Sequence, residues 1–109
     1  MIREIQFEAE YIKPLDDSTL VTGRCCGDTV LLGDNFSIVY DQDTSLQPVA
    51  LFNGRNVCLE VAAITPLSNS SQCSWDFIDP GCLARIELIG RGRETLHPFC
   101  VLVNDKQGP

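Results

Sequence analysis

The sequence predicts an all-β fold, and two observations lead to it. Apolar and polar residues alternate in several short stretches, as in half-buried strands, and turn-forming residues separate these stretches. No stretch repeats apolar residues at the spacing of an amphipathic helix. The 109 residues are enough for one domain with a single core. Seven or eight short strands in one domain indicate a small barrel or a sandwich, and closing the barrel would remove exposed strand edges.

The first half of the chain is expected to form four strands. They span residues 5–11, 20–26, 29–32 and 36–40. Polar turn residues at 13–18 end the first strand, and Gly33 with its polar neighbours forms a tight turn. Gly23 interrupts the second strand, which suggests a bulge or a bend there. Gly27 and Gly33 are expected to adopt positive φ at hairpin corners.

The second half is expected to form four more strands and one long loop. The strands span residues 46–53, 57–64, 83–89 and 95–103, with Pro48 and Pro98 interrupting the first and the last. Residues 53–56 begin with Asn-Gly, a strong signal for a hairpin turn. Residues 65–80 form the longest irregular stretch, and the tail 104–109 is expected to be disordered.

Charge limits the classes of partner. Fifteen acids against eight bases give a net charge of -7. This balance disfavours nucleic acid, since lysine and arginine supply most of the affinity for phosphate. It suits solubility, or a basic partner attracted by electrostatic steering. No secretory signal is visible and no apolar run is long enough to span a membrane, so we expect a cytoplasmic protein without a membrane partner.

The six cysteines and the single histidine are the candidates for chemistry. No two cysteines have the Cys-x-x-Cys spacing of a metal or redox motif. We expect reduced cysteines that fill the core, with a disulfide framework or a zinc site as the alternatives. Cys100 and His97 are a nucleophile and a base by residue type, but neighbours on one strand seldom meet. The sequence therefore predicts no enzyme, no metal and no cofactor.

A spaced set of residues resembles a known family. The run Val21-Thr22-Gly23-Arg24 is followed by Gly27, Val30, Gly33-Asp34 and Phe36-Ser37-Ile38-Val39. This pattern resembles the second domain of translational GTPases such as elongation factor Tu. The segments 78–84 and 88–90 resemble that domain's Ala-Gly-Asp segment and the strand that leads to its Arg-Gly turn.

The resemblance covers the chain from about Phe7 to about Val103 and implies a small closed β-barrel. It implies no GTP hydrolysis, since the GTPase domain is absent from this chain. In the complete factors this barrel helps to bind aminoacyl-tRNA or the ribosome.

Three groups of residues are candidates for binding. Trp75, Asp76 and Phe77 lie in the longest loop, where aromatic side chains either anchor a partner or close one end of the barrel. Arg91 and Arg93 form a basic pair around a glycine that suits phosphate or an acidic partner. Arg24, within the Thr-Gly-Arg run, is the third candidate.

These observations favour a non-enzymatic cytosolic module that recognises a protein partner through its loops. An acidic antagonist of a basic protein, for instance an immunity protein against a nuclease toxin, is one form of this function. The alternative, carried by the resemblance, is a translation-associated module that binds RNA or the ribosome.

Overall fold

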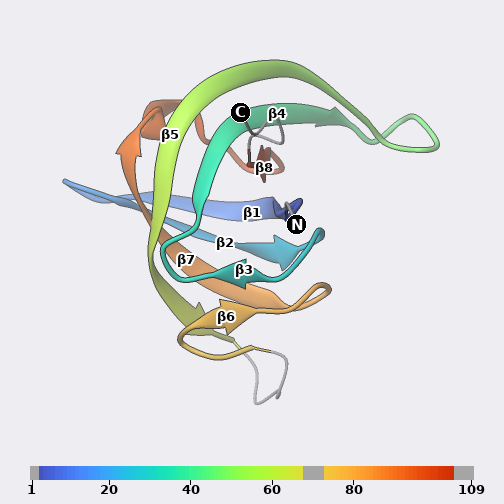
Figure 1. Ribbon diagram of the computed structural model, residues 1–109. Helices are drawn as coiled ribbons and strands as arrows, with labels where there is room; N and C mark the ends of the chain where they lie inside the picture. Colours follow the sequence, from blue (N-terminus) through green and yellow to red (C-terminus); the bar gives the residue numbers. More distant parts are fainter. Residues whose placement is uncertain (1–2, 68–72, 105–109) are drawn as a thin grey trace.

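The computed structural model describes residues 3–67 and 73–104. Six antiparallel strands form a closed barrel in the order β1-β2-β7-β5-β4-β8 (Figure 1). These strands are β1 (Gln6–Pro14), β2 (Thr19–Cys25), β4 (Asn35–Asp43), β5 (Ala50–Pro66), β7 (Leu83–Arg91) and β8 (Val101–Val103). The short strands β3 (Val30–Leu31) and β6 (Phe77–Ile78) pair in a second small sheet, and η1 (Arg93–Thr95) is a 3-10 turn. The predicted all-β fold is confirmed.

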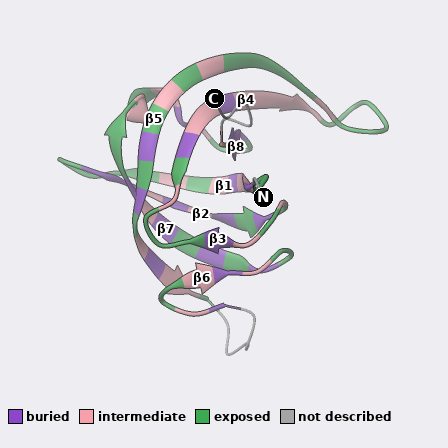
Figure 2. Ribbon diagram, viewed as in Figure 1, coloured by how far each residue is buried: buried purple, intermediate pink, exposed green. Residues whose placement is uncertain are grey.

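The core fills the inside of the barrel because alternate side chains of each strand point inward. In β1, Phe7 and Ala9 are fully buried while their neighbours are not. Figure 2 shows the same alternation of buried and exposed residues along β7. The largest fully buried side chains come from five of the six ring strands and from β6: Phe7, Phe36, Leu59, Ile64, Ile78, Ile86, Leu88 and Leu102.

The short strand β8 closes the ring. Leu102 pairs with Phe7 of β1 on one side and with Val39 of β4 on the other, and all three residues are fully buried. Without β8, the edges of β1 and β4 would both be open. Asn104, directly after β8, accepts a hydrogen bond from the backbone N–H of Ile5 (3.0 Å) and donates one to the carbonyl of Arg3 (2.7 Å). The rest of the predicted disordered tail, residues 105–109, lies outside the described residues.

Two glycines are needed for close approach between strands. A Cβ at Gly23 would lie 2.1 Å from the carbonyl oxygen of Glu8, next to a register shift in β1. The predicted bulge therefore lies in the partner strand. The expectation of positive φ is confirmed at Gly33 (φ 91°) and is wrong at Gly27, where the carbonyl oxygen of Glu4 would lie 2.3 Å from a Cβ.

The predicted hairpin turn at residues 53–56 is wrong. Strand β5 runs without a break from Ala50 to Pro66, and the connection to β4 is formed by residues 44–49. Asn53 has a φ of 57°, and β5 carries one more residue than β4 between their pairs Asp41–Phe52 and Val39–Arg55. The Asn-Gly pair thus forms a bulge instead of a turn. A bulge is the other common place for a residue with positive φ in a strand.

Two other strand boundaries differ from the prediction. Only Val101–Val103 of the expected last strand is extended, because η1 and a loop occupy the residues before it. The expected long loop is shorter, since β5 continues to Pro66 and β6 lies within it; residues 68–72 lie outside the described part. No helix in the described ranges is long and apolar enough to cross a membrane.

Candidate functional site

The hairpin of β4 and β5 extends beyond the wall of the barrel. Strand β4 pairs with β8 only as far as Tyr40, and β5 pairs with β7 only from Cys58 onward. Between these points, residues 41–52 pair only with each other, and we name this ribbon the arm. Figure 1 shows its tip well outside the ring of strands. A two-stranded ribbon covers neither of its own faces, so its apolar side chains stay in solvent.

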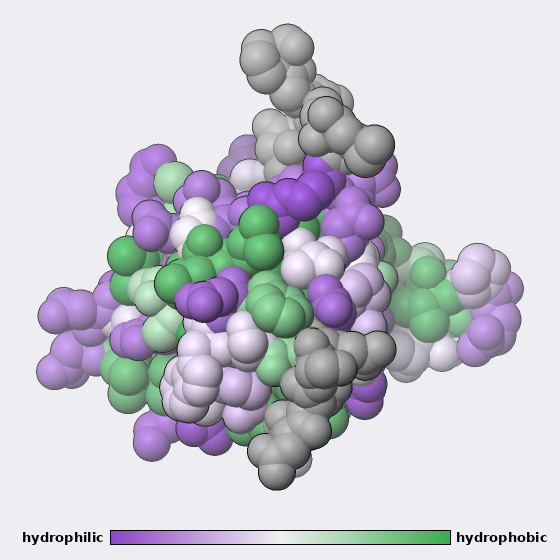
Figure 3. Space-filling view, turned by 60° about the horizontal axis from the view of Figure 1, so that its bottom comes forward, coloured by the Kyte–Doolittle hydropathy of each residue, from purple (hydrophilic) through white to green (hydrophobic). Residues whose placement is uncertain are grey.

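The arm carries a group of exposed large apolar side chains: Leu46, Val49, Leu51 and Phe52. The space-filling view shows hydrophobic residues on the projecting tip, at the right of the picture (Figure 3). Phe99, in the loop before β8, is 61% exposed. Its carbonyl accepts a hydrogen bond from the amide of Gln42 in the arm (2.9 Å). The arm and its root thus expose five large apolar side chains, with Leu51 and Phe52, as neighbours in one strand, on opposite faces of the ribbon.

The backbone of Phe99 is strained. Its φ is 70°, a conformation that costs free energy for a bulky residue. Two hydrogen bonds hold it there: its N–H donates to the carbonyl of Ala9 (2.9 Å), and its carbonyl accepts from Gln42. The fold therefore holds a large aromatic side chain in solvent through a strained backbone, as is common at binding sites.

A polar cluster fixes the root of the arm. Asp41 accepts hydrogen bonds from Arg55 (2.9 Å) and Asn53 (2.9 Å), and its Oδ1 lies 2.6 Å from Nε2 of His97. The Arg55 guanidinium, followed by Asn53 and His97, holds the pKa of Asp41 well below its ordinary value. Because His97 belongs to the segment between η1 and β8, the cluster ties the arm to the barrel.

Four of the predicted binding residues gather at the β3–β6 end of the barrel. The Arg24 guanidinium donates to the carbonyl of Gly81, just after β6. Trp75 is 67% exposed, so the interpretation of this side chain as a plug of the barrel is wrong. Phe77 is half-buried in β6, and the carbonyl of Asp76 accepts a hydrogen bond from Leu32 (2.9 Å). Two exposed leucines lie beside them, Leu31 and Leu32.

The other two predicted residues lie at the opposite end of β7. Arg91 is the last residue of β7, and Arg93 begins η1. Since β7 starts at Leu83 beside Arg24, the length of the strand separates the two groups by about 25 Å. Arg91 and Arg93 border a hollow together with the β1–β2 turn, including Asp16. The six predicted residues therefore form two sites, neither of them on the arm.

The cysteines and His97 do not assemble a catalytic pair. Cys100 is packed in the core, and burial raises the pKa of its thiol, while the ring of His97 is turned to Asp41. Burial also raises the pKa of Cys25 to about 11. All six cysteines lie in the described ranges, and only Cys26 and Cys58 are exposed. Within those ranges no three histidine, cysteine or acidic side chains gather as metal ligands.

Sequence reasoning missed the arm. The sequence places Leu51 and Phe52 in an expected strand, and in an ordinary strand one of two neighbouring side chains is buried. Both are exposed. The only local signal for the arm is the pair of adjacent large apolar residues next to Asn-Gly. Asn-Gly ordinarily predicts a hairpin turn.

Comparison with known proteins gives the fold and no family. No protein-family model matches the chain, and no curated protein matches it either. Among solved structures, the chain is similar to the apo form of translation elongation factor SelB from Methanococcus maripaludis, with a TM-score of 0.66 and 16% sequence identity. The match covers 97% of this chain and 21% of the SelB chain. At this identity the likeness concerns the fold alone, which is consistent with the predicted elongation-factor type of β domain.

Proposed function

We propose that this chain is a non-enzymatic binding module whose arm docks a partner protein. The observation that carries the proposal is the group of exposed apolar side chains on the arm, together with Phe99 at its root. Exposed large apolar side chains gathered on one element of a domain are typical of protein interfaces, and large aromatic side chains contribute most to interface affinity. The net charge of -7 favours a basic partner.

The chemistry of the described residues supports binding over catalysis. The one histidine is engaged with Asp41, and the thiol of Cys100 lies among core side chains. The polar cluster of Asp41, Arg55 and Asn53 is saturated by its own hydrogen bonds and is positioned to hold the arm in place.

Capture of partners from a native lysate tests the proposal. Tagged wild-type chain is compared with the double variant Phe52→Ser with Phe99→Ser, which removes two exposed rings without touching the core. Tyr11→Ser is the matched control, because Tyr11 is 71% exposed on β1 and lines a different hollow, with Lys13, Leu20, Thr22 and Arg85. We expect a discrete protein retained by wild type and by Tyr11→Ser and lost from the double variant. Equal retention by all three would refute the role of the arm.

The likeness to SelB supports a second candidate function, a translation-associated module that binds RNA or the ribosome. Arg91 and Arg93 are the basic residues that would serve it, on a hollow that they share with Asp16 and Glu94. This candidate predicts capture of ribosomal material that is lost on ribonuclease treatment, falls steeply with salt and falls when Arg24, Arg91 or Arg93 is replaced by glutamine. Capture that survives ribonuclease favours the protein-binding module instead.

A further inference from the structure

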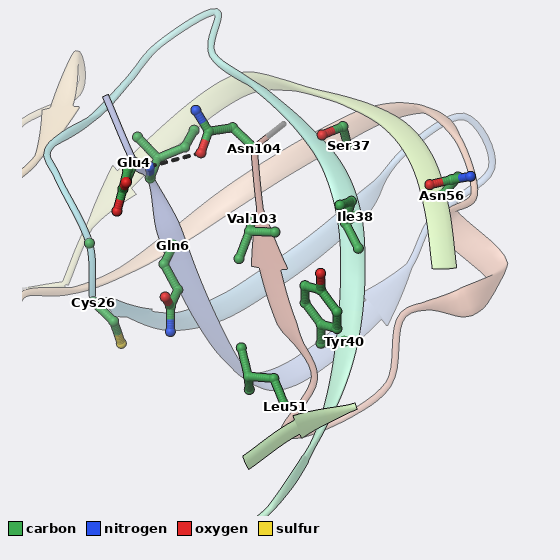
Figure 4. A pocket seen from close by; sticks show the side chains of 12 residues that line it. Glu4, Gln6, Cys26, Ser37, Ile38, Tyr40, Leu51, Asn56, Val103 and Asn104 are labelled. Carbon is green, nitrogen blue, oxygen red and sulfur yellow. Dashed lines mark hydrogen bonds between the residues drawn. The ribbon is translucent and has the colours of Figure 1, made fainter. Parts of the chain in front are cut away.

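A groove of about 820 Å³ crosses the outer wall of the barrel below the arm. Its floor follows one row of cross-strand neighbours over four strands: Gln6 of β1, Val103 of β8, Ile38 of β4 and Asn56 of β5. Figure 4 shows these side chains around the hollow, with Leu51 of the arm at its border. Because Leu51 belongs to both the groove and the arm, the two surfaces are continuous.

The floor has an apolar centre between two amide groups. Ile38 and Val103 form an apolar centre, and the amides of Gln6 and Asn56 lie at the two ends of the row. Primary amides both donate and accept hydrogen bonds, so they match the N–H and C=O groups of a peptide backbone. Ser37 also lines the groove, and its Oγ is buried without a hydrogen-bond partner among the described residues.

The ring of Tyr40 forms a wall of the groove, and it has room there because residue 54 is a glycine. A Cβ at Gly54 would lie 2.7 Å from the ring of Tyr40, so only glycine leaves room for the ring at the bulge of β5. The bulge that replaced the predicted turn therefore shapes the groove.

The charges of the groove select the kind of occupant. Among its described lining residues there is no lysine or arginine, and Glu4 is the one charged side chain. The chain as a whole carries a net charge of -7. A phosphate backbone or an acidic peptide would meet no cation here, whereas a basic segment would be attracted.

We infer that the groove binds an extended basic segment of the partner protein. An apolar side chain of that segment packs on Ile38 and Val103, and its backbone groups pair with the amides of Gln6 and Asn56. This inference rests on the proposed function, since it names the peptide site next to the docking arm.

Selection of short random peptides displayed on phage tests the inference. The immobilised full chain is the bait, and selected peptides are then titrated by calorimetry. Asn56→Arg places a positive charge in the groove at an exposed position. The matched control is Asn35→Arg, the same change at an exposed residue of β4 outside the groove. We expect peptides rich in lysine or arginine that bind wild type and Asn35→Arg equally and bind Asn56→Arg about tenfold more weakly.

Ser37→Ala provides a second readout that a merely structural role would not give. Removing a buried hydroxyl without a partner relieves a desolvation cost, so the melting temperature should rise while peptide affinity falls. Selection of no peptide, selection of acidic peptides, binding of a single-stranded RNA oligomer in the groove, or equal affinity for Asn56→Arg would each overturn the inference. If arm variants lose the captured partner and Asn56→Arg keeps it, the groove inference fails while the proposed function stands.

Discussion

Burial sets the reactivity of the six cysteines. Desolvation raises the pKa of Cys25, Cys73 and Cys100, so these buried thiols hold little of the reactive thiolate at pH 8. We expect a chromogenic disulfide reagent to modify the two exposed thiols of the native chain first, Cys58 before Cys26, because burial also raises the pKa of Cys26. The other four should react only after unfolding in urea. More than two fast thiols, or fewer than six after unfolding, would contradict this assignment.

The lowered pKa of Asp41 gives a pH-dependent contribution to stability. The group ionises more readily in the folded chain than at its ordinary pKa of 3.8, so the folded state favours the carboxylate. The contribution is complete above this ordinary value and is lost as the pH falls through the lowered pKa. Asp41→Asn should therefore be less stable than wild type at pH 7, with a difference that shrinks below about pH 4. Urea unfolding of wild type and Asp41→Asn side by side across this range measures the difference.

Glycine is required at position 23 because of a close contact with the neighbouring strand, and not because of its backbone φ angle. A Cβ there would overlap the carbonyl oxygen of Glu8, so β1 and β2 would have to separate. We expect Gly23→Ala to lower the free energy of unfolding by about 2–3 kcal/mol. Gly81→Ala is the control, since Gly81 has a φ of 91° and open space around it, and it should cost about 1 kcal/mol. The reverse order in urea unfolding would contradict this account.

At the scale of the element, the tip of the arm is separable from the barrel. Asp43 pairs with Ala50, so residues 44–49 can be replaced by Asn-Gly, which closes a two-residue hairpin. The tip contributes none of the core residues. We therefore expect the free energy of unfolding to change by less than about 1 kcal/mol, while partner capture falls. A shortened chain that fails to fold in circular dichroism would show that the tip belongs to the barrel.

The elements show which parts of the fold the sequence predicts well. Local alternation predicts the inward face of β1 and β7, because each side chain there is either in the core or in solvent. The alternation of apolar and polar residues in one strand does not predict where the strand beside it ends. The arm exists because β8 and β7 end their pairing at Tyr40 and Cys58, which is a property of distant segments. For the same reason Asn53 and Gly54 were assigned to a turn, although they form a bulge in a continuous strand.

At the scale of the molecule, six strands form a closed ring. A binding function therefore depends on residues that lie outside this ring. The residues singled out from the sequence, such as Trp75 and Arg91, remain exposed but lie at opposite ends of the barrel. The arm and the groove below it come together only in the folded chain. The sequence thus indicates candidate residue types, and not where the folded chain brings exposed residues together.

The central claim is that the arm docks a partner protein. The most direct test is capture from native lysate treated with ribonuclease, with wild type, the Phe52→Ser with Phe99→Ser double variant, and Tyr11→Ser compared at equal amounts. The account predicts one discrete protein retained by wild type and Tyr11→Ser and lost from the double variant. Retention by all three chains, or ribosomal material that disappears with ribonuclease, would contradict it.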